Sequence, residues 1–232
     1  MSAAVDPIVK WVGGKRKLLN ELVSRLPNSY VHYYELFAGG VALRLALPPV
    51  RYAVISDANH NLINTYSWVV TDCHAVERQL NILNDEFLTG NAAVQSGMYY
   101  RVRAEFNNDA QAWDDGAHQA ARFIFLNKVG YNGLYRESGN GFNVPIGDNR
   151  KPLIVPPNLH EFKSAIATTT LMHGDFRQFI TQPMGGDLVY CDPPYDGTFT
   201  GYTAKGFTKC DLADLAKACR LFDARDVFYG FK

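Results

Sequence analysis

The sequence lacks a net charge, because its 23 Lys and Arg residues equal its 23 Asp and Glu residues across 232 positions. A strongly basic chain would point directly to a nucleic-acid partner, and this balance does not. No apolar stretch approaches the roughly 20 residues that a membrane-spanning helix needs, so we expect no membrane partner. The N-terminus has no apolar segment of a secretory signal, which favours a cytoplasmic protein. The 47% hydrophobic and 20% charged residues are typical of a globular chain.

Cysteine is scarce, with Cys73, Cys191, Cys210 and Cys219 as the four in the chain. None forms a C-x-x-C pair, and no histidine lies at zinc-ligand spacing from them. We therefore expect no structural zinc at these thiols, and a reducing compartment fits this usage better than secretion.

The charges are unevenly distributed along the chain. Residues 1–26 and 120–151 each carry five basic against two acidic side chains, whereas residues 72–115 carry eight acidic against three basic. Such segregation can create a local positive face on a neutral protein. Ordinary surface variation explains it equally well.

Hydrophobic spacing predicts an α/β protein. Apolar residues recur at helical spacing over 15–26, 59–70 and 212–222, a short helix is expected over 175–180, and residues 72–127 look mostly helical. Strands are expected at 30–37, 51–56, 168–172, 187–191 and 227–231. Strands that alternate with helices predict a parallel sheet.

One region interrupts this alternation. Residues 128–158 are rich in Gly, Asn and Pro and have no helical period. A loop of this length is usually functional or disordered, and its aromatic residues, Arg136 and Lys151 favour function. We therefore predict a domain made of residues 1–70 and 159–232, with residues 71–158 inserted as a subdomain.

Two motifs follow predicted strands and suggest ligand contacts. In ELFAGG, Glu35 to Gly40, glycine allows a ligand to approach the backbone. Asp57 ends the next strand, where a carboxylate can accept hydrogen bonds from ribose hydroxyls. The full G-x-G-x-x-G pattern is missing, which argues against a dinucleotide, and a plain structural turn remains an alternative.

The second motif is DPPY, Asp192 to Tyr195. Its prolines remove two backbone donors and stiffen the turn, while their carbonyls stay available. The Asp192 carboxylate and the flat Tyr195 ring suit an exocyclic amino group on a planar base. The alternative is a Pro-rich turn that ends a strand.

Together with KWVGGK (10–15), SDAN (56–59), GYNGLYR (130–136) and FNVP (142–145), these motifs stand in the order of a known family. The chain resembles the Dam-type (D12 class) DNA adenine-N6 methyltransferases over residues 8 to about 222. Such enzymes use S-adenosylmethionine to methylate adenine in GATC sites of double-stranded DNA. The resemblance implies a Rossmann-like class I methyltransferase sheet with an inserted helical DNA-recognition subdomain, in the cytoplasm of a bacterial or phage-infected cell.

The resemblance also implies roles for single residues. In the family, Trp11 and Lys15 touch the cofactor, Asp57 binds its ribose, and Phe37 and Gly39 belong to the turn on its methionine side. Asp175 and Phe176 stand where such enzymes hold the cofactor's adenine, and core packing is a close alternative for Phe176. Asp192 belongs to this cofactor set as well as to the catalytic one.

Asp192, Pro193, Pro194 and Tyr195 match the catalytic motif. A target adenine inside a duplex must be flipped out before its amine can be reached, and Tyr195 would then stack on it. Methyl transfer is a direct displacement, so we expect neither a covalent enzyme intermediate nor a metal.

The loop at 128–151 resembles the DNA-reading hairpin of the family. Tyr131 stands where a family aromatic inserts between base pairs, and Arg136 where an arginine reads guanine. The other implied DNA contacts are Lys10, Asn132, Leu134 and Pro145. A glycine-rich surface loop without base contacts is the alternative.

The chain departs from the family at its end, where family members continue through further strands. We expect residues 227–231 to replace the next strand and a final hairpin to be missing, which exposes a sheet edge. A second departure is at Asp148 and Asn149, where members of the family tend to carry a basic and an aromatic residue.

Two other functions stay open: a methyltransferase for cytosine N4 or a protein glutamine, and a non-catalytic DNA-binding remnant.

Overall fold

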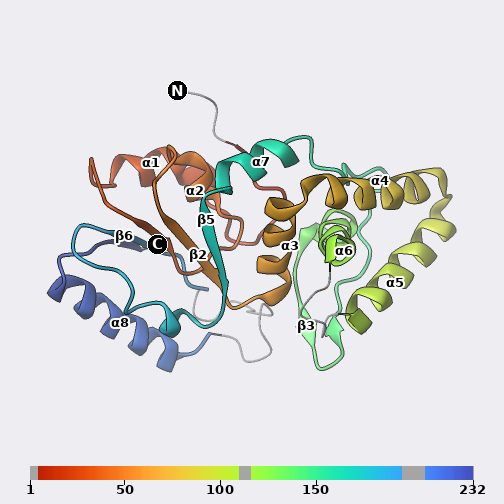
Figure 1. Cartoon of the computed structure of the whole chain (residues 1–232). Helices are drawn as coiled ribbons and strands as arrows, with labels where there is room; N and C mark the ends of the chain where they lie inside the picture. The colour runs from red at the N-terminus through yellow and green to blue at the C-terminus, as the bar shows by residue number, and fades with distance from the viewer. Residues whose placement is uncertain (1–4, 110–115, 195–206, 232) are drawn as a thin grey trace.

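The computed structural model describes residues 5–109, 116–194 and 207–231 (Figure 1). Its centre is a five-stranded sheet in the order β5-β2-β1-β6-β7. Every pairing in this sheet is parallel. The strands are β1 (Tyr33–Glu35), β2 (Ala53–Asp57), β5 (Thr169–His173), β6 (Leu188–Cys191) and β7 (Phe228–Phe231). The predicted parallel α/β class is confirmed.

Helices cover both faces of the sheet, because alternate strand residues point to opposite sides. Tyr34 and Val189 pack in a core with Phe222 of α8 (Lys209–Ala224). Tyr33 and Leu188 pack in another core, against α1 (Leu19–Ser24) and α2 (Ala42–Ala46). Figure 1 shows α1 and α2 on one side of the sheet and α8 on the other.

A group of helices lies beside the sheet (Figure 1). It contains α3 (His60–Thr71), α4 (Cys73–Thr89), α5 (Ala92–Asp109), α6 (Gly116–Val129) and α7 (Leu159–Ile166). Most of α6 is buried, which makes it the central helix of the group. One continuous core runs from Ile55 of β2 to Phe125 of α6, and α3 is the helix of the group that contacts β2 and β5. The boundaries of the inserted subdomain stay a prediction.

The segment before β5 contains a helix that the sequence did not predict. Residues 159–166 form α7, between the predicted irregular segment 128–158 and the predicted strand 168–172. Leu159, Phe162 and Ile166 are its buried positions, at the three- and four-residue spacing of a helix. Its eight residues are too few for a strong periodic signal, and packing against the core stabilises the helix.

Residues 128–158 contain a short hairpin, in agreement with their predicted non-helical character. After η2 (Tyr131–Gly133), strands β3 (Glu137–Ser138) and β4 (Gly141–Phe142) pair antiparallel. The Tyr131 N–H donates to the Pro145 carbonyl at 2.9 Å, and the Gly147 N–H to the Val129 carbonyl at 2.9 Å. These bonds close the base of the hairpin.

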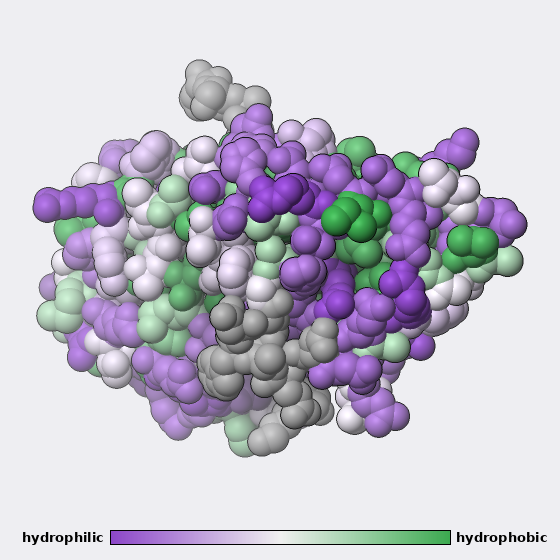
Figure 2. All heavy atoms as spheres, turned by 45° about the vertical axis from the view of Figure 1, so that its right-hand side comes forward, coloured by the Kyte–Doolittle hydropathy of each residue, from purple (hydrophilic) through white to green (hydrophobic). Residues whose placement is uncertain are grey.

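The remaining short elements are η1 (Arg16–Leu18) and η3 (Phe176–Gln178), a 3-10 turn where a short helix was expected. β7 forms one edge of the sheet, and the missing family hairpin beyond it stays a prediction. No helix among the described residues has the length and hydrophobicity needed to cross a bilayer. The face in Figure 2 is mainly hydrophilic, with small separate hydrophobic areas.

Candidate functional site

The sheet has a topological switch point between β1 and β6. From β1 the chain proceeds to β2 and β5 on one side, and then to β6 and β7 on the other. In open α/β sheets, ligands bind at the carboxyl ends of strands beside such a point. The FAGG turn follows β1, Asp57 ends β2, Asp175 follows β5 and Asp192 follows β6. Four separate segments thus bring polar groups to the same edge.

A cavity of about 1190 Å³ opens at this edge. It exceeds the roughly 300–1,000 Å³ of a typical single-ligand site, so it has room for more than one bound group. The predicted cofactor and catalytic residues that the structure describes all line it: Trp11, Lys15, Phe37, Gly39, Asp57, Asp175, Phe176, Asp192, Pro193 and Pro194. Tyr195, the remaining predicted catalytic residue, lies outside the described residues.

Asp57 holds the FAGG turn in place. Its carboxylate accepts hydrogen bonds from the Gly39 N–H at 3.0 Å and the Asn59 N–H at 2.8 Å. Burial raises the pKa of Asp57, and these two N–H groups oppose that shift. On the other side of the turn, the Tyr66 hydroxyl donates to the Gly39 carbonyl at 2.7 Å.

Trp11 lies directly against Gly39. A Cβ at Gly39 would stand 2.7 Å from Trp11 Cδ1, and the φ of +46° also favours glycine. The next non-glycine residue with positive φ is Val41, at 52°, immediately before α2. A left-handed β-branched residue is rare, so the turn carries backbone strain next to the cavity.

Lys15 and Asp192 form an ion pair in the cavity wall. Their Nζ and Oδ2 atoms are 2.5 Å apart, and Lys15 is only 6% exposed. The ammonium also donates to the Gly13 carbonyl. The KWVGGK segment therefore positions the carboxylate of the DPP turn, a contact between residues 177 positions apart that the sequence did not predict.

Glu35, at the end of β1, is a buried carboxyl group in the cavity wall. Burial raises its pKa to about 8, although the Tyr33 hydroxyl donates to it at 2.8 Å. The nearby charge of Asp192 raises it further. Burial therefore favours the protonated form of Glu35.

An aromatic group forms another wall of the cavity. Phe37 packs on Phe176 with ring centres 5.2 Å apart, and Phe207 meets Phe37 edge-on at 5.8 Å. The Arg177 guanidinium lies 4.7 Å from the centre of the Phe176 ring. Both oxygens of Asp175 accept hydrogen bonds from Arg177, so this carboxylate is already engaged by a neighbour.

The predicted DNA-contact residues lie on and beside the hairpin. Tyr131 is 45% exposed, and Asn132 and Pro145 are also exposed. Leu134 and Arg136 are half-buried. None of these five lines the cavity, whereas Lys10 does. Lys10 connects these residues to the cavity, because its side chain packs closely on Gly133 of the hairpin. A Cβ added at Gly133 would lie 2.5 Å from Lys10 Cδ.

Asn143 orients Arg136. Its Oδ1 accepts from Arg136 Nε at 2.6 Å, and its carbonyl accepts from Nη2 at 3.2 Å. Asn143 is the asparagine of the FNVP motif. The sequence therefore pointed to this residue, but not to its contact with Arg136.

Asn127 joins the hairpin to the KWVGGK segment. Its side chain accepts from the Lys10 N–H at 2.7 Å and donates to the Lys10 carbonyl at 2.8 Å. It also donates to the Gly133 carbonyl at 3.0 Å. The sequence gave no signal for this role, because an asparagine near the end of a helix resembles any polar position.

Tyr135 makes a second connection between hairpin and cavity. Its ring stacks on Trp11, with centroids 5.7 Å apart and planes inclined by 28°. Its hydroxyl donates to Glu137 and accepts from Asn61 Nδ2, the latter at 3.1 Å. Between the half-buried Leu134 and Arg136, Tyr135 is the residue that turns inward to the cavity wall.

Known proteins are similar to this chain over most of its length. The model of the D12 class N6 adenine-specific DNA methyltransferase family matches residues 11–228. The chain is 36% identical to the Retron Ec67 DNA adenine methylase of Escherichia coli, over 91% of this chain and 71% of that protein. It is 35% identical to the Type II methyltransferase M.MjaIII of Methanocaldococcus jannaschii, over 95% of this chain and 81% of that protein. A DNA adenine methylase of Vibrio cholerae is 30% identical, over 90% of this chain and 73% of that protein.

Proposed function

The chain belongs to the D12 class N6 adenine-specific DNA methyltransferase family, and we propose that it transfers a methyl group from S-adenosylmethionine to N6 of adenine in double-stranded DNA. We propose GATC as the site and base flipping as the way the adenine reaches the cavity. The observation that carries this proposal is one cavity lined by Trp11, the FAGG turn, Asp57, Phe176 and the DPP turn.

The cofactor half of the cavity fits S-adenosylmethionine. Asp57 uses two of its about four lone-pair sites on backbone N–H groups, which leaves acceptors for ribose hydroxyls. Phe37 and Phe176 offer flat apolar surfaces for a purine. Gly39 lets a ligand approach the backbone of the turn. When bound, the cofactor supplies a methyl carbon that is activated by its sulfonium sulfur.

Asp192 and the proline carbonyls would hold the target amine. The N6–H groups of a flipped adenine donate to them, which turns the nitrogen lone pair towards the methyl carbon. The lone pair would form the new N–C bond, the electrons of the breaking C–S bond would stay on sulfur, and the proton released from N6 would pass to solvent water. The Asp192 carboxylate stabilises the positive charge that develops on nitrogen, and Lys15 fixes the position of that carboxylate. Positioning of this kind accounts for a large part of catalysis.

The hairpin surface would read the DNA. Arg136, held by Asn143, offers N–H donors to a guanine edge. Tyr131 is exposed beside the cavity and can fill the space that a flipped base leaves in the stack. Leu134 and Pro145 would add apolar contacts, and Asn132 and Lys10 polar ones.

Transfer of tritium from labelled S-adenosylmethionine tests the proposal. Two duplexes are compared, one with GATC and one with the same bases scrambled, using wild-type and Asp192→Ala protein. We expect transfer to the GATC duplex alone, with at least a hundredfold loss in Asp192→Ala. Thermal unfolding of both proteins controls for folding.

The alternatives predict different outcomes. Transfer to both duplexes keeps the chemistry and refutes GATC. Label on cytosine N4 instead of adenine indicates the related amino-methyltransferase. A folded wild-type chain that binds the GATC duplex and transfers no label is the non-catalytic remnant.

A further inference from the structure

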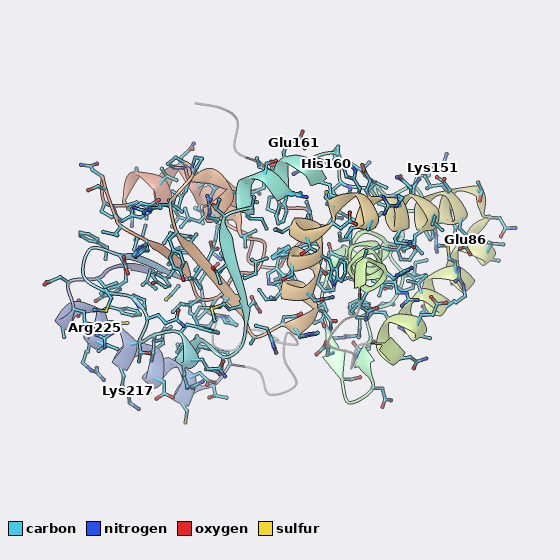
Figure 3. The ribbon with its side chains drawn as sticks, viewed as in Figure 1. Glu86, Lys151, His160, Glu161, Lys217 and Arg225 are labelled. Atoms are coloured by element: carbon cyan, nitrogen blue, oxygen red, sulfur yellow. The ribbon has the colours of Figure 1, made fainter. Side chains whose placement is uncertain are left out.

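Three potential metal ligands meet where α4 and α7 lie side by side, away from the cavity. His74 and Glu77 stand one turn apart on α4, and His160 is near the start of α7. Glu77 Oε2 lies 3.1 Å from His160 Nε2 and 3.7 Å from His74 Nδ1. One ligand atom from each residue falls within 4.8 Å of the other two. Figure 3 shows His160 at α7, on the side towards α4.

The two separations that involve Glu77 are close to the spacing of ligands around zinc. Zn–N and Zn–O bonds of about 2.0–2.2 Å at tetrahedral angles place neighbouring ligand atoms about 3.3–3.6 Å apart. The separations from Glu77 Oε2 to His160 Nε2 and to His74 Nδ1, 3.1 and 3.7 Å, lie on either side of that range. Small rotations of exposed side chains would equalise them.

Hydrogen bonding alone engages only part of the group. The His160–Glu77 contact is a hydrogen bond at 3.1 Å, whereas 3.7 Å is too long for one between His74 and Glu77. The His74 and His160 rings nevertheless lie 4.9 Å apart, with both rings beside the same carboxylate. A cation between them would use all three groups.

The surroundings permit a divalent ion. The His74 side chain is 73% exposed and that of His160 47%, which leaves an entry path and space for a water ligand.

We propose that His74, Glu77 and His160 bind one Zn²⁺, with water as the fourth ligand. Two imidazoles and one carboxylate suit zinc and related transition metals better than Mg²⁺ or Ca²⁺, which prefer oxygen ligands. The ion would link α4, the first helix after α3, to α7, the helix before β5. It would stabilise the two connections between the sheet and the helical group, one through α3 and α4 and the other through α7. It would take no part in methyl transfer. This inference does not depend on the proposed function.

The test uses full-length, untagged protein that has been stripped with a chelator and dialysed. Zn²⁺ is titrated by calorimetry into wild type, His160→Gln, the double variant His74→Gln/His160→Gln, and His118→Gln. His118 is an exposed histidine on α6 and serves as the matched control. In this experiment wild type means the sequence with the single change Cys210→Ser, and every variant carries that change too, because the exposed Cys210 thiol could bind zinc by itself. Thermal unfolding is recorded with and without Zn²⁺.

We expect one equivalent of Zn²⁺ on wild type and His118→Gln, and at least tenfold weaker binding in His160→Gln. The double variant should show no saturable binding. At a hundredfold excess over Kd, Zn²⁺ should raise the Tm of wild type by about 5–10 °C, and the double variant should not respond. Mg²⁺ should have no effect on either. Unchanged stoichiometric binding in the double variant, or no binding by wild type, would overturn the site.

Discussion

Replacing Asn127 by alanine tests whether the hairpin and the cofactor side of the cavity are mechanically linked. Asn127 is 3% exposed and satisfies three backbone groups: the N–H and carbonyl of Lys10 and the carbonyl of Gly133. An unsatisfied buried group costs about 1–3 kcal/mol. Lys10 is exposed, so water can reach some of these three backbone groups, and the lower cost of about 1 kcal/mol per group applies. We expect a loss of about 3 kcal/mol in the free energy of unfolding.

The loss should also weaken cofactor binding, because Trp11 directly follows Lys10. In the variant, cofactor binding must also order the KWVGGK segment. If this uses binding free energy equal to about half of the lost stabilisation, the Kd of S-adenosylmethionine rises about tenfold. Calorimetric titration with S-adenosylmethionine, together with urea unfolding, measures both quantities.

Asn107→Ala is the matched control. Asn107 makes a similar two-point contact, with its Oδ1 accepting from the Phe142 N–H at 2.9 Å and its Nδ2 donating to the Phe142 carbonyl at 3.0 Å. It supports the far end of the hairpin and does not touch Lys10. We expect it to reduce stability and leave the cofactor Kd within twofold of wild type. Equal changes in Kd for both variants, or no change in Asn127→Ala, would refute the link.

Three further predictions concern the cavity and the hairpin. Gly39→Ala places a Cβ 2.7 Å from Trp11 at a φ of +46°, so calorimetry should show at least tenfold weaker cofactor binding, and near-wild-type binding would contradict the contact. Asn143→Ala frees the Arg136 guanidinium, so the ratio of methylation rates on GATC and single-mismatch duplexes should fall about tenfold; an unchanged ratio would show that Asn143 does not orient this arginine. Glu35 has a pKa raised to about 8 in the folded protein, so the unfolded chain loses its proton first and stability falls as pH rises from about 4.5 to 8. Glu35→Gln should flatten that decline by up to a few kcal/mol, measured by urea unfolding at pH 5, 6.5 and 8, and an identical slope in both proteins would contradict the shift.

Much of the sheet was predictable because its strands are short apolar runs that end in motifs. Val54, Val189 and their neighbours belong to such runs, and the residues after them meet at one edge by the geometry of parallel strands. That rule explains why Asp57, Asp175 and Asp192 line one cavity. The motif order supplied the remaining cofactor residues.

Contacts between distant segments could not be predicted in the same way. Lys15 meets Asp192, and Asn127 meets Lys10, across more than a hundred residues of chain. Nothing in the local sequence distinguishes a buried asparagine that pairs with backbone from one that faces solvent. Tyr135 is similar: it belongs to a quoted motif, yet only packing shows that it faces Trp11.

The most direct test of the central claim is the identity of the methylated nucleoside. A GATC duplex is incubated with the protein and S-adenosylmethionine, digested to nucleosides and analysed by mass spectrometry against N6-methyldeoxyadenosine and N4-methyldeoxycytidine standards. We expect N6-methyldeoxyadenosine alone, at up to one per GATC strand, and none from the scrambled duplex. Methylated cytidine, or unmodified DNA from a folded protein that binds the cofactor, would contradict this claim.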